Sequence, residues 1–236
     1  MLKVITAFKQ ILTPLCELQE SAWNGEEPKW KPSERALETY KFVSGQLLLS
    51  VRPIKPEDIE QFFSPSKTAK VNFFKENRVL YLPPLRKDAD DAEFVPIFSL
   101  CCNLSKNKST AKFRVMLVTL DKNDKNDKKK LNGIGFRMET PEGRTKIHDF
   151  HHAQLIQQFS PKQFDNILPT KCPSWIPGSQ PSFPLPANCP VTLLLCLIVT
   201  LYGGEYYTKI CGRISGIEQY RNKLAELMGK KPTRRK

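Results

Sequence analysis

Near the start of the chain, apolar residues recur every three or four positions. The series is Val4, Phe8, Ile11, Leu15 and Leu18. Because an α-helix turns once in 3.6 residues, this spacing places the five side chains on one face. It predicts an amphipathic helix over residues 2–19, docked on a core or on a partner. After a linker rich in tryptophan and proline, Ser33 is placed to cap a short helix over residues 34–40.

Between residues 42 and 150 the pattern changes to short segments that alternate apolar and polar residues or are rich in β-branched and aromatic ones. Such segments are typical of β-strands. The expected strands are 42–51, 71–74, 79–82, 94–100, 113–120, 134–139 and 147–150. Short spacings between them favour an antiparallel meander, interrupted by a helical turn that begins at Pro56 and ends near Phe63.

The last third of the chain begins with a belt of prolines from Pro161 to Pro190. We interpret it as a rigid strap across the domain, and the alternative is a polyproline ligand for another protein. Pro190 suits the first turn of a helix that ends near Gly203. Its apolar run is about half the ~20 residues that a membrane-spanning helix needs, which predicts a buried core helix. A last amphipathic helix is expected over residues 214–228.

These patterns together predict an α+β fold, in which an antiparallel sheet is packed by N-terminal and C-terminal helices. The alternative architecture is a small β-barrel with peripheral helices. The chain has 236 residues, which is enough for one sizeable core. We expect a single domain over residues 1–228 and a basic tail over residues 229–236.

The chain is strongly basic, with 37 Lys and Arg against 24 Asp and Glu and a formal net charge of +13. Such an excess favours polyanionic partners such as nucleic acid. The charge is clustered in two loops, residues 105–112 and 121–130, and in the C-terminal tail. The candidate phosphate-binding residues are Lys106, Lys108, Lys112, Lys125, Lys128, Lys129, Lys130, Lys230, Lys231, Arg234 and Arg235. The alternative interpretation is that the lysines in the loops are solvated loop tips.

All three histidines, His148, His151 and His152, lie within five residues. On a helix the three share one face, and on a strand His148 and His152 share a face. Either geometry brings two imidazoles together. His148 and His152 could then ligate Zn²⁺ or Mn²⁺, or the cluster could supply a general acid and base. The structural alternative is a hydrogen-bond network.

Two further residues strengthen this cluster as a candidate catalytic site. Arg137 and Glu139 fall on the same face of the strand that precedes the histidines. They could bind phosphate and position a base, or they could simply form an ion pair. Established catalytic signatures such as H-E-x-x-H, the P-loop or G-x-S-x-G do not occur in the sequence. We therefore expect no cofactor, with zinc or manganese at the histidines as the alternative.

The cysteines predict a cytoplasmic protein. There are seven of them, none in a C-x-x-C pair, and Cys101 and Cys102 are adjacent. An N-terminal apolar segment with a small-residue cleavage site is not evident either. This usage favours reduced thiols over a disulfide framework.

Three segments carry a resemblance. They are Gly-Phe-Arg-Met-Glu-Thr-Pro at 135–141, His-Asp-Phe-His-His-Ala-Gln at 148–154, and the tryptophan- and proline-rich segment at 175–187. They resemble motifs of small bacterial proteins found in mobile or anti-phage defence islands. The resemblance implies a cytoplasmic antiviral context and names no activity.

We expect a nucleic-acid-associated subunit of a multi-component assembly, without catalysis. Its partners would be RNA or DNA, bound through phosphates, and other proteins, with no membrane. The first alternative is a metal-dependent hydrolase or nuclease centred on His148, His151 and His152. The second is a scaffold that binds only protein and carries its charge incidentally. Metal analysis of the purified protein would separate the first alternative from the others.

Overall fold

A computed structural model describes residues 2–26, 32–47, 51–64, 69–73, 75–84, 94–105, 109–121, 130–141, 150–156, 182–213 and 222. In chain order the elements are α1 (Leu2–Trp23), α2 (Glu34–Leu47), β1 (Arg52–Pro53), α3 (Pro56–Phe62), β2 (Ala69–Asn72), β3 (Arg78–Tyr81), β4 (Val95–Leu104), β5 (Ser109–Asp121), β6 (Lys130–Glu139), β7 (His152–Ile156), β8 (Phe183–Pro184) and α4 (Pro190–Arg213). The fold is α+β, as the sequence predicted.

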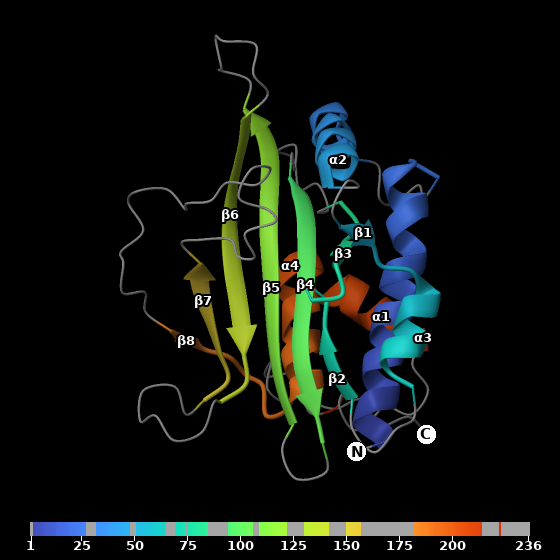
Figure 1. Cartoon of the computed structure of the whole chain (residues 1–236). Helices are drawn as coiled ribbons and strands as arrows, with labels where there is room; N and C mark the ends of the chain where they lie inside the picture. Colours follow the sequence, from blue (N-terminus) through green and yellow to red (C-terminus); the bar gives the residue numbers. More distant parts are fainter. Residues whose placement is uncertain are drawn as a thin grey trace.

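The strands form one sheet in the order β1-β3-β4-β5-β6-β7-β8, with β2 beside β4 next to the end of β3 (Figure 1). Among the described strands, β1 pairs with β3 in parallel and the other pairs are antiparallel. The long strands β4, β5 and β6 form the predicted meander at its centre. The sheet is open between β1 and β8, so the barrel alternative is wrong.

Helices α1, α3 and α4 cover one face of the sheet (Figure 1). The main core between them is rich in phenylalanine. Phe8 of α1 stacks on Phe63 at 5.6 Å between ring centroids and meets Phe113 of β5 at 6.2 Å. Phe113 in turn stacks on Phe98 of β4 at 5.9 Å. These rings join the N-terminal helix to the two central strands, so the amphipathic stripe predicted for residues 2–19 faces the core.

Helix α2 covers one end of the opposite face. Tyr40 stacks on Trp23 at 4.6 Å and meets Tyr81 of β3 edge-on at 5.2 Å. The end of β5 is tied to the same helix, because Arg35 donates two hydrogen bonds to the Leu120 carbonyl, at 3.2 Å and 2.7 Å. The rest of this face, toward β2 and the start of β5, is not covered by any described helix (Figure 1).

The strand predicted from residue 42 is wrong at its start. Residues 42–47, expected in a strand, complete helix α2. Ala36, Thr39 and Val43 are all fully buried and follow helical spacing, so packing of this stripe outweighs the β-propensity of the segment. The predicted cap of this helix is confirmed, since Ser33 Oγ accepts the Ala36 N–H at 3.1 Å.

Other predicted elements are confirmed with shifted bounds. The strand predicted at 113–120 begins at Ser109, so the end of the expected basic loop belongs to β5. Helix α4 begins at Pro190 as expected, and it is kinked rather than ended at Gly203, whose φ is +75°. The seventh strand was predicted over residues 147–150, but Phe150 is not in a strand and β7 begins at His152. Residues 147–149, residues 214–228 apart from residue 222, and the tail at 229–236 lie outside the described residues. The proline belt does too, up to residue 181.

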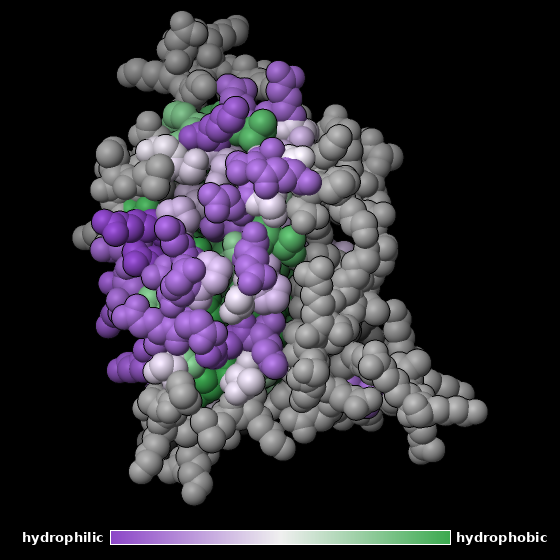
Figure 2. All heavy atoms as spheres, turned by 90° about the vertical axis from the view of Figure 1, so that its right-hand side faces the viewer, coloured by the Kyte–Doolittle hydropathy of each residue, from purple (hydrophilic) through white to green (hydrophobic). Residues whose placement is uncertain are grey.

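Figure 2 shows the side of the molecule formed by α1, α2 and α3. Hydrophilic side chains predominate there, and hydrophobic residues show only in small gaps between them. This is the pattern of helices that bury one face against a core and expose the other to water.

Gly135 of β6 provides a test of the packing between β5, β6 and β7. A Cβ atom added there would lie 2.6 Å from Met116 Sδ and closer still to Ile156. We predict that Gly135→Ala lowers the free energy of unfolding by about 1–3 kcal/mol, because neighbouring side chains must shift. Gly45→Ala is the control. Gly45 lies in α2 with open space around its Cα, so alanine should be neutral or stabilise by up to about 1 kcal/mol. Urea unfolding measures both, and equal effects would contradict the packing described here.

Candidate functional site

The half of this sheet face that no described helix covers carries rows of polar side chains. Alternate residues of a strand point to the same face, and the register aligns these residues across neighbouring strands. One row crosses five strands and consists of Asn72, Cys101, Lys112, Glu139 and His152. The next row, nearer to α2, consists of Ser99, Arg114, Arg137 and Gln154.

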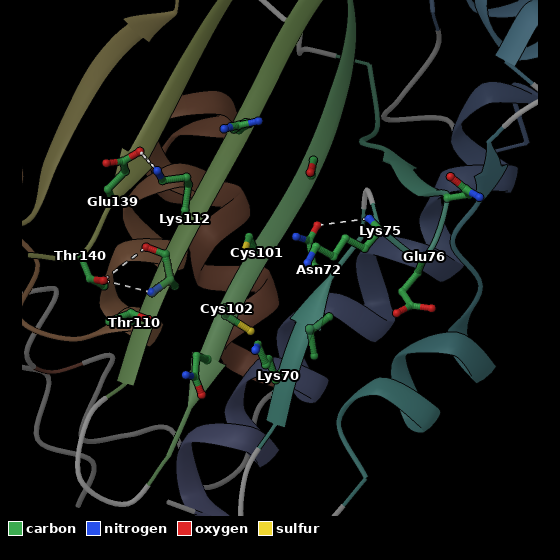
Figure 3. A pocket seen from close by; sticks show the side chains of 16 residues that line it. Lys70, Asn72, Lys75, Glu76, Cys101, Cys102, Thr110, Lys112, Glu139 and Thr140 are labelled. Atoms are coloured by element: carbon green, nitrogen blue, oxygen red, sulfur yellow. Dashed lines mark hydrogen bonds and ion pairs between the residues drawn. The ribbon is translucent and has the colours of Figure 1, made fainter. Parts of the chain in front are cut away.

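A hollow of about 1080 Å³ opens over the part of these rows that lies on β2, β4, β5 and the end of β6 (Figure 3). Arg137, Gln154 and His152 are not among its lining residues. Its floor is formed by β2, β4 and β5, and the turn between β2 and β3 adds residues 75–77. The cations that line it are Lys70, Lys75, Lys112 and Arg114, and the acids are Glu76 and Glu139. Cations therefore outnumber carboxylates in the lining.

Glu139 is the centre of an ionic cluster at the β6 side of the hollow. Glu139 as a whole is only 4% exposed. Lys112 Nζ lies 2.8 Å and Arg137 Nε 3.2 Å from its Oε1, and His152 Nε2 lies 3.7 Å from its Oε2. Because a buried carboxylate must be compensated, this cluster holds the side chains of β5, β6 and β7 in fixed relation. The side chains of Lys112 and Arg137 remain 31% and 34% exposed, so two cations reach solvent beside one hidden anion.

Two arginines are neighbours in the second row. Arg114 and Arg137 are directly opposite each other on β5 and β6. Burial lowers the pKa of Arg114, and the charge of Arg137 lowers it further, while Glu139 opposes the shift. Arg137 is held in place, since its Nε also donates to Gln154 Oε1 at 2.9 Å. Adjacent like charges on a fixed frame attract an anion with several acceptor oxygens.

His152 has a structural position. It is 1% exposed, its Nδ1 lies 2.9 Å from the Phe150 carbonyl oxygen, and its Nε2 faces Glu139. An imidazole buried in this way does not reach a substrate. His151, one residue before β7, is half-buried, and burial followed by the proximity of His152 lowers its pKa. His148 lies outside the described residues, so its predicted pairing with His152 stays a prediction.

The ion pair proposed for Arg137 and Glu139 is confirmed. The described part of the chain contains no group of three or more His, Cys, Asp or Glu side chains that could hold a metal ion. The absence of such a group agrees with the burial of His152, whose Nε2 is directed at Glu139.

Of the predicted phosphate-binding residues, only Lys112 and Lys130 lie within the described part of the chain. Lys112 was expected in a loop and lies instead in β5, paired with Glu139. Lys130 begins β6, and its side chain is not described. The rest lie outside the described residues, namely Lys106, Lys108, Lys125, Lys128, Lys129, Lys230, Lys231, Arg234 and Arg235.

Three cations of this face were not among the residues predicted from the sequence, namely Lys70, Lys75 and Arg114. For Arg114 a signal was present, because Lys112 and Arg114 are two residues apart in a segment with strand periodicity. Alternation would have placed them on one face, as it did Arg137 and Glu139. For Lys70 and Lys75 no such signal existed, since the pairing of β2 with β4 was needed to bring them here.

Comparison with known proteins adds nothing to this picture, because no family model, curated protein or solved structure matches the chain.

A helix that crosses a bilayer must be both long and apolar. Within the described ranges no helix meets both requirements.

Removing the buried charge tests the ionic cluster. We predict that Glu139→Gln lowers the free energy of unfolding by about 1–3 kcal/mol, because Lys112 and Arg137 then face each other without a carboxylate between them. The effect should shrink in high salt, which screens the repulsion of these partly exposed cations. Urea unfolding at low and high salt measures both effects. An unchanged unfolding energy in low salt would show that the cluster adds nothing to stability.

The pKa of His151 predicts a pH dependence. In the unfolded chain histidine titrates near 6.5, and in the folded protein the pKa of His151 is lower. The unfolded state therefore binds more protons as the pH falls, so stability is full above about pH 6.5 and decreases below it. We predict that His151→Gln reduces this decrease between about pH 7 and 5. Melting temperatures of both proteins across this range measure it, and identical pH profiles would contradict the prediction.

Proposed function

We propose that the protein binds nucleic acid through its phosphates on the polar half of the sheet, as a non-catalytic subunit of a larger assembly. The observation that carries this proposal is the excess of cations over carboxylates in the hollow formed by β2, β4, β5 and β6. Arginine and lysine on a rigid frame are the usual contacts to phosphate oxygens.

The charge of the whole chain supports the same proposal. A formal net charge of +13 attracts polyanions from a distance, and a concave surface of the same sign concentrates them. A protein-only scaffold would not need a basic hollow. Proteins that bind nucleic acid mostly by charge also bind with weak dependence on base sequence, so RNA and DNA are both candidate ligands.

A metal-dependent hydrolase receives less support. Its proposed centre was the histidine cluster, and His152 is buried with both ring nitrogens directed at protein groups, the Phe150 carbonyl and Glu139. We keep metal analysis of the purified protein as the test, since stoichiometric zinc or manganese that disappears on substituting His148 would reverse this preference.

The cellular setting is part of the proposal. The described cysteines Cys16, Cys101, Cys102, Cys189 and Cys196 are free thiols, which supports a reducing compartment such as the cytoplasm. The resemblance of residues 135–141 and 148–154 to bacterial defence-island proteins supports an antiviral role in which this chain contributes nucleic-acid binding and other subunits contribute catalysis.

A pair of matched double variants tests the binding surface. Lys70 and Lys75 are exposed and line the hollow, whereas Lys41 and Lys55 are exposed and do not line it. Both Lys70→Gln/Lys75→Gln and Lys41→Gln/Lys55→Gln remove two positive charges. We predict that only the first weakens binding of a labelled oligonucleotide, because only its lysines meet phosphates.

Fluorescence anisotropy over a salt series measures the effect. The slope of log K against log salt should become shallower by about 0.7–0.9 for each phosphate that the variant no longer neutralises. Equal weakening in the two variants would show that only the overall charge matters. No binding by the unaltered protein at low salt would refute the proposed function.

A further inference from the structure

We infer that the site takes a single strand of nucleic acid, laid across the strands from β7 to β2, with one base stacked on Phe150. The inference rests on the proposed function and deepens it, because it names the form of the ligand and a residue that recognises bases. Three features of the sheet face support it.

The first feature is an exposed aromatic ring on the face that carries the cations. Phe150 is 39% exposed, and its ring meets the His152 ring edge-on at 5.6 Å. His152 lies on the row of Lys112 and Glu139, so Phe150 stands beside this row at the β7 end. The described chain exposes few other large apolar side chains, namely Phe94 and Phe183.

The second feature is the rigidity of that ring's support. The Phe150 carbonyl is bonded to His152 Nδ1, and His152 is buried against Glu139. An exposed aromatic ring on a fixed support is what stacking on a base requires. Proteins that bind single strands combine such rings with a basic groove that follows the backbone.

The third feature is the depth of the cations. Lys112 and Arg114 line the floor of the hollow, while Lys75, Glu76 and Asn77 line it from the β2–β3 turn (Figure 3). A duplex is convex and carries its phosphates on the outside, so it meets the rim of a hollow before the floor. A single strand is thin enough to enter, and its bases are free to turn toward a ring.

The dimensions agree with this arrangement. The span from Asn72 on β2 to the exposed Phe150 beside β7 crosses five strands, which at about 4.8 Å between strands is about 20 Å. A segment of several nucleotides spans such a distance, within the range of sites on sheet-based single-strand binders. Phosphates would lie over Lys112, Arg114 and Lys70, and a base at the β7 end would reach Phe150.

The test uses the full chain and three probes of the same length, about 12 nucleotides. One is a single strand of mixed sequence, one is the same strand annealed to its complement, and one is an abasic strand that keeps the phosphates and lacks the bases. We expect the mixed single strand to bind more tightly than the duplex and the abasic strand in anisotropy titrations at one salt concentration.

Substitution of the ring identifies its role. Phe150→Leu should weaken binding of the mixed strand by about 5- to 150-fold and leave the abasic strand almost unchanged, because only stacking on a base is removed. Phe150→Trp keeps an aromatic ring and should bind the mixed strand about as tightly as the unaltered protein does. Phe183→Leu is the matched control. Phe183 is 55% exposed, but it pairs with Ala153, which packs against the main core. Phe183 therefore lies on the opposite face of the sheet from the cations. Equal melting temperatures confirm that the variants fold.

Two failures are distinguishable. If the duplex binds as tightly as the single strand, or if Phe150→Leu binds the mixed strand as well as the unaltered protein does, the inference is overturned while phosphate binding stands. If none of the probes binds at low salt, the proposed function itself fails.

Discussion

The open half of the sheet depends on one buried carboxylate. Glu139 is surrounded by Lys112, Arg137 and His152, which come from the strand on each side and from its own. A buried charge without partners would be too costly to keep ionised, so these contacts must form together when β5, β6 and β7 pair. The same contacts hold two cations at the surface of a sheet, where long basic side chains would otherwise move freely. The carboxylate thus contributes to the fold and fixes the positions of the positive charges.

The two ends of this sheet face have different roles because α2 reaches only one of them. Arg35 and Thr39 bind the main chain of β5 at Leu120. Tyr40 stacks on Trp23 and meets Tyr81 of β3 edge-on. Beneath the helix the residues that face outward from the sheet are apolar, such as Met116 and Val118. Beyond it they are Arg114 and Lys112 on the same strand. The change from apolar to basic along β5 therefore coincides with the edge of the helix, as expected if the uncovered part meets water or a polar ligand.

Much of the fold was predictable from periodicity alone, and the site was predictable only in part. Helical spacing from Val4 to Leu18 and strand alternation in β4, β5 and β6 are local signals. They predicted helix α1 and the three central strands. The strand expected from residue 42 was wrong because Val43 packs as part of a helical stripe, and that packing requires a tertiary partner which the sequence does not display. For the site, Arg137 and Glu139 were found because they lie two residues apart on one strand. The inward position of His152 was not, since it follows from the register of β7 against β6.

The pairing of Arg114 with Arg137 is the feature that stability alone does not explain. Directly opposed residues on neighbouring strands normally combine opposite charges or apolar groups, and like charges there are unfavourable. Glu139 offsets part of the repulsion, and it is also engaged by Lys112. Burial first, and then the charge of Arg137, lower the pKa of Arg114. A sequence under selection for stability alone would carry an apolar residue or a carboxylate at one of the two positions. Local conflicts of this kind concentrate at sites where a ligand completes the structure. A phosphate bound on this part of the sheet, as we propose, would reduce the repulsion between the two arginines, so binding would also relieve this local conflict.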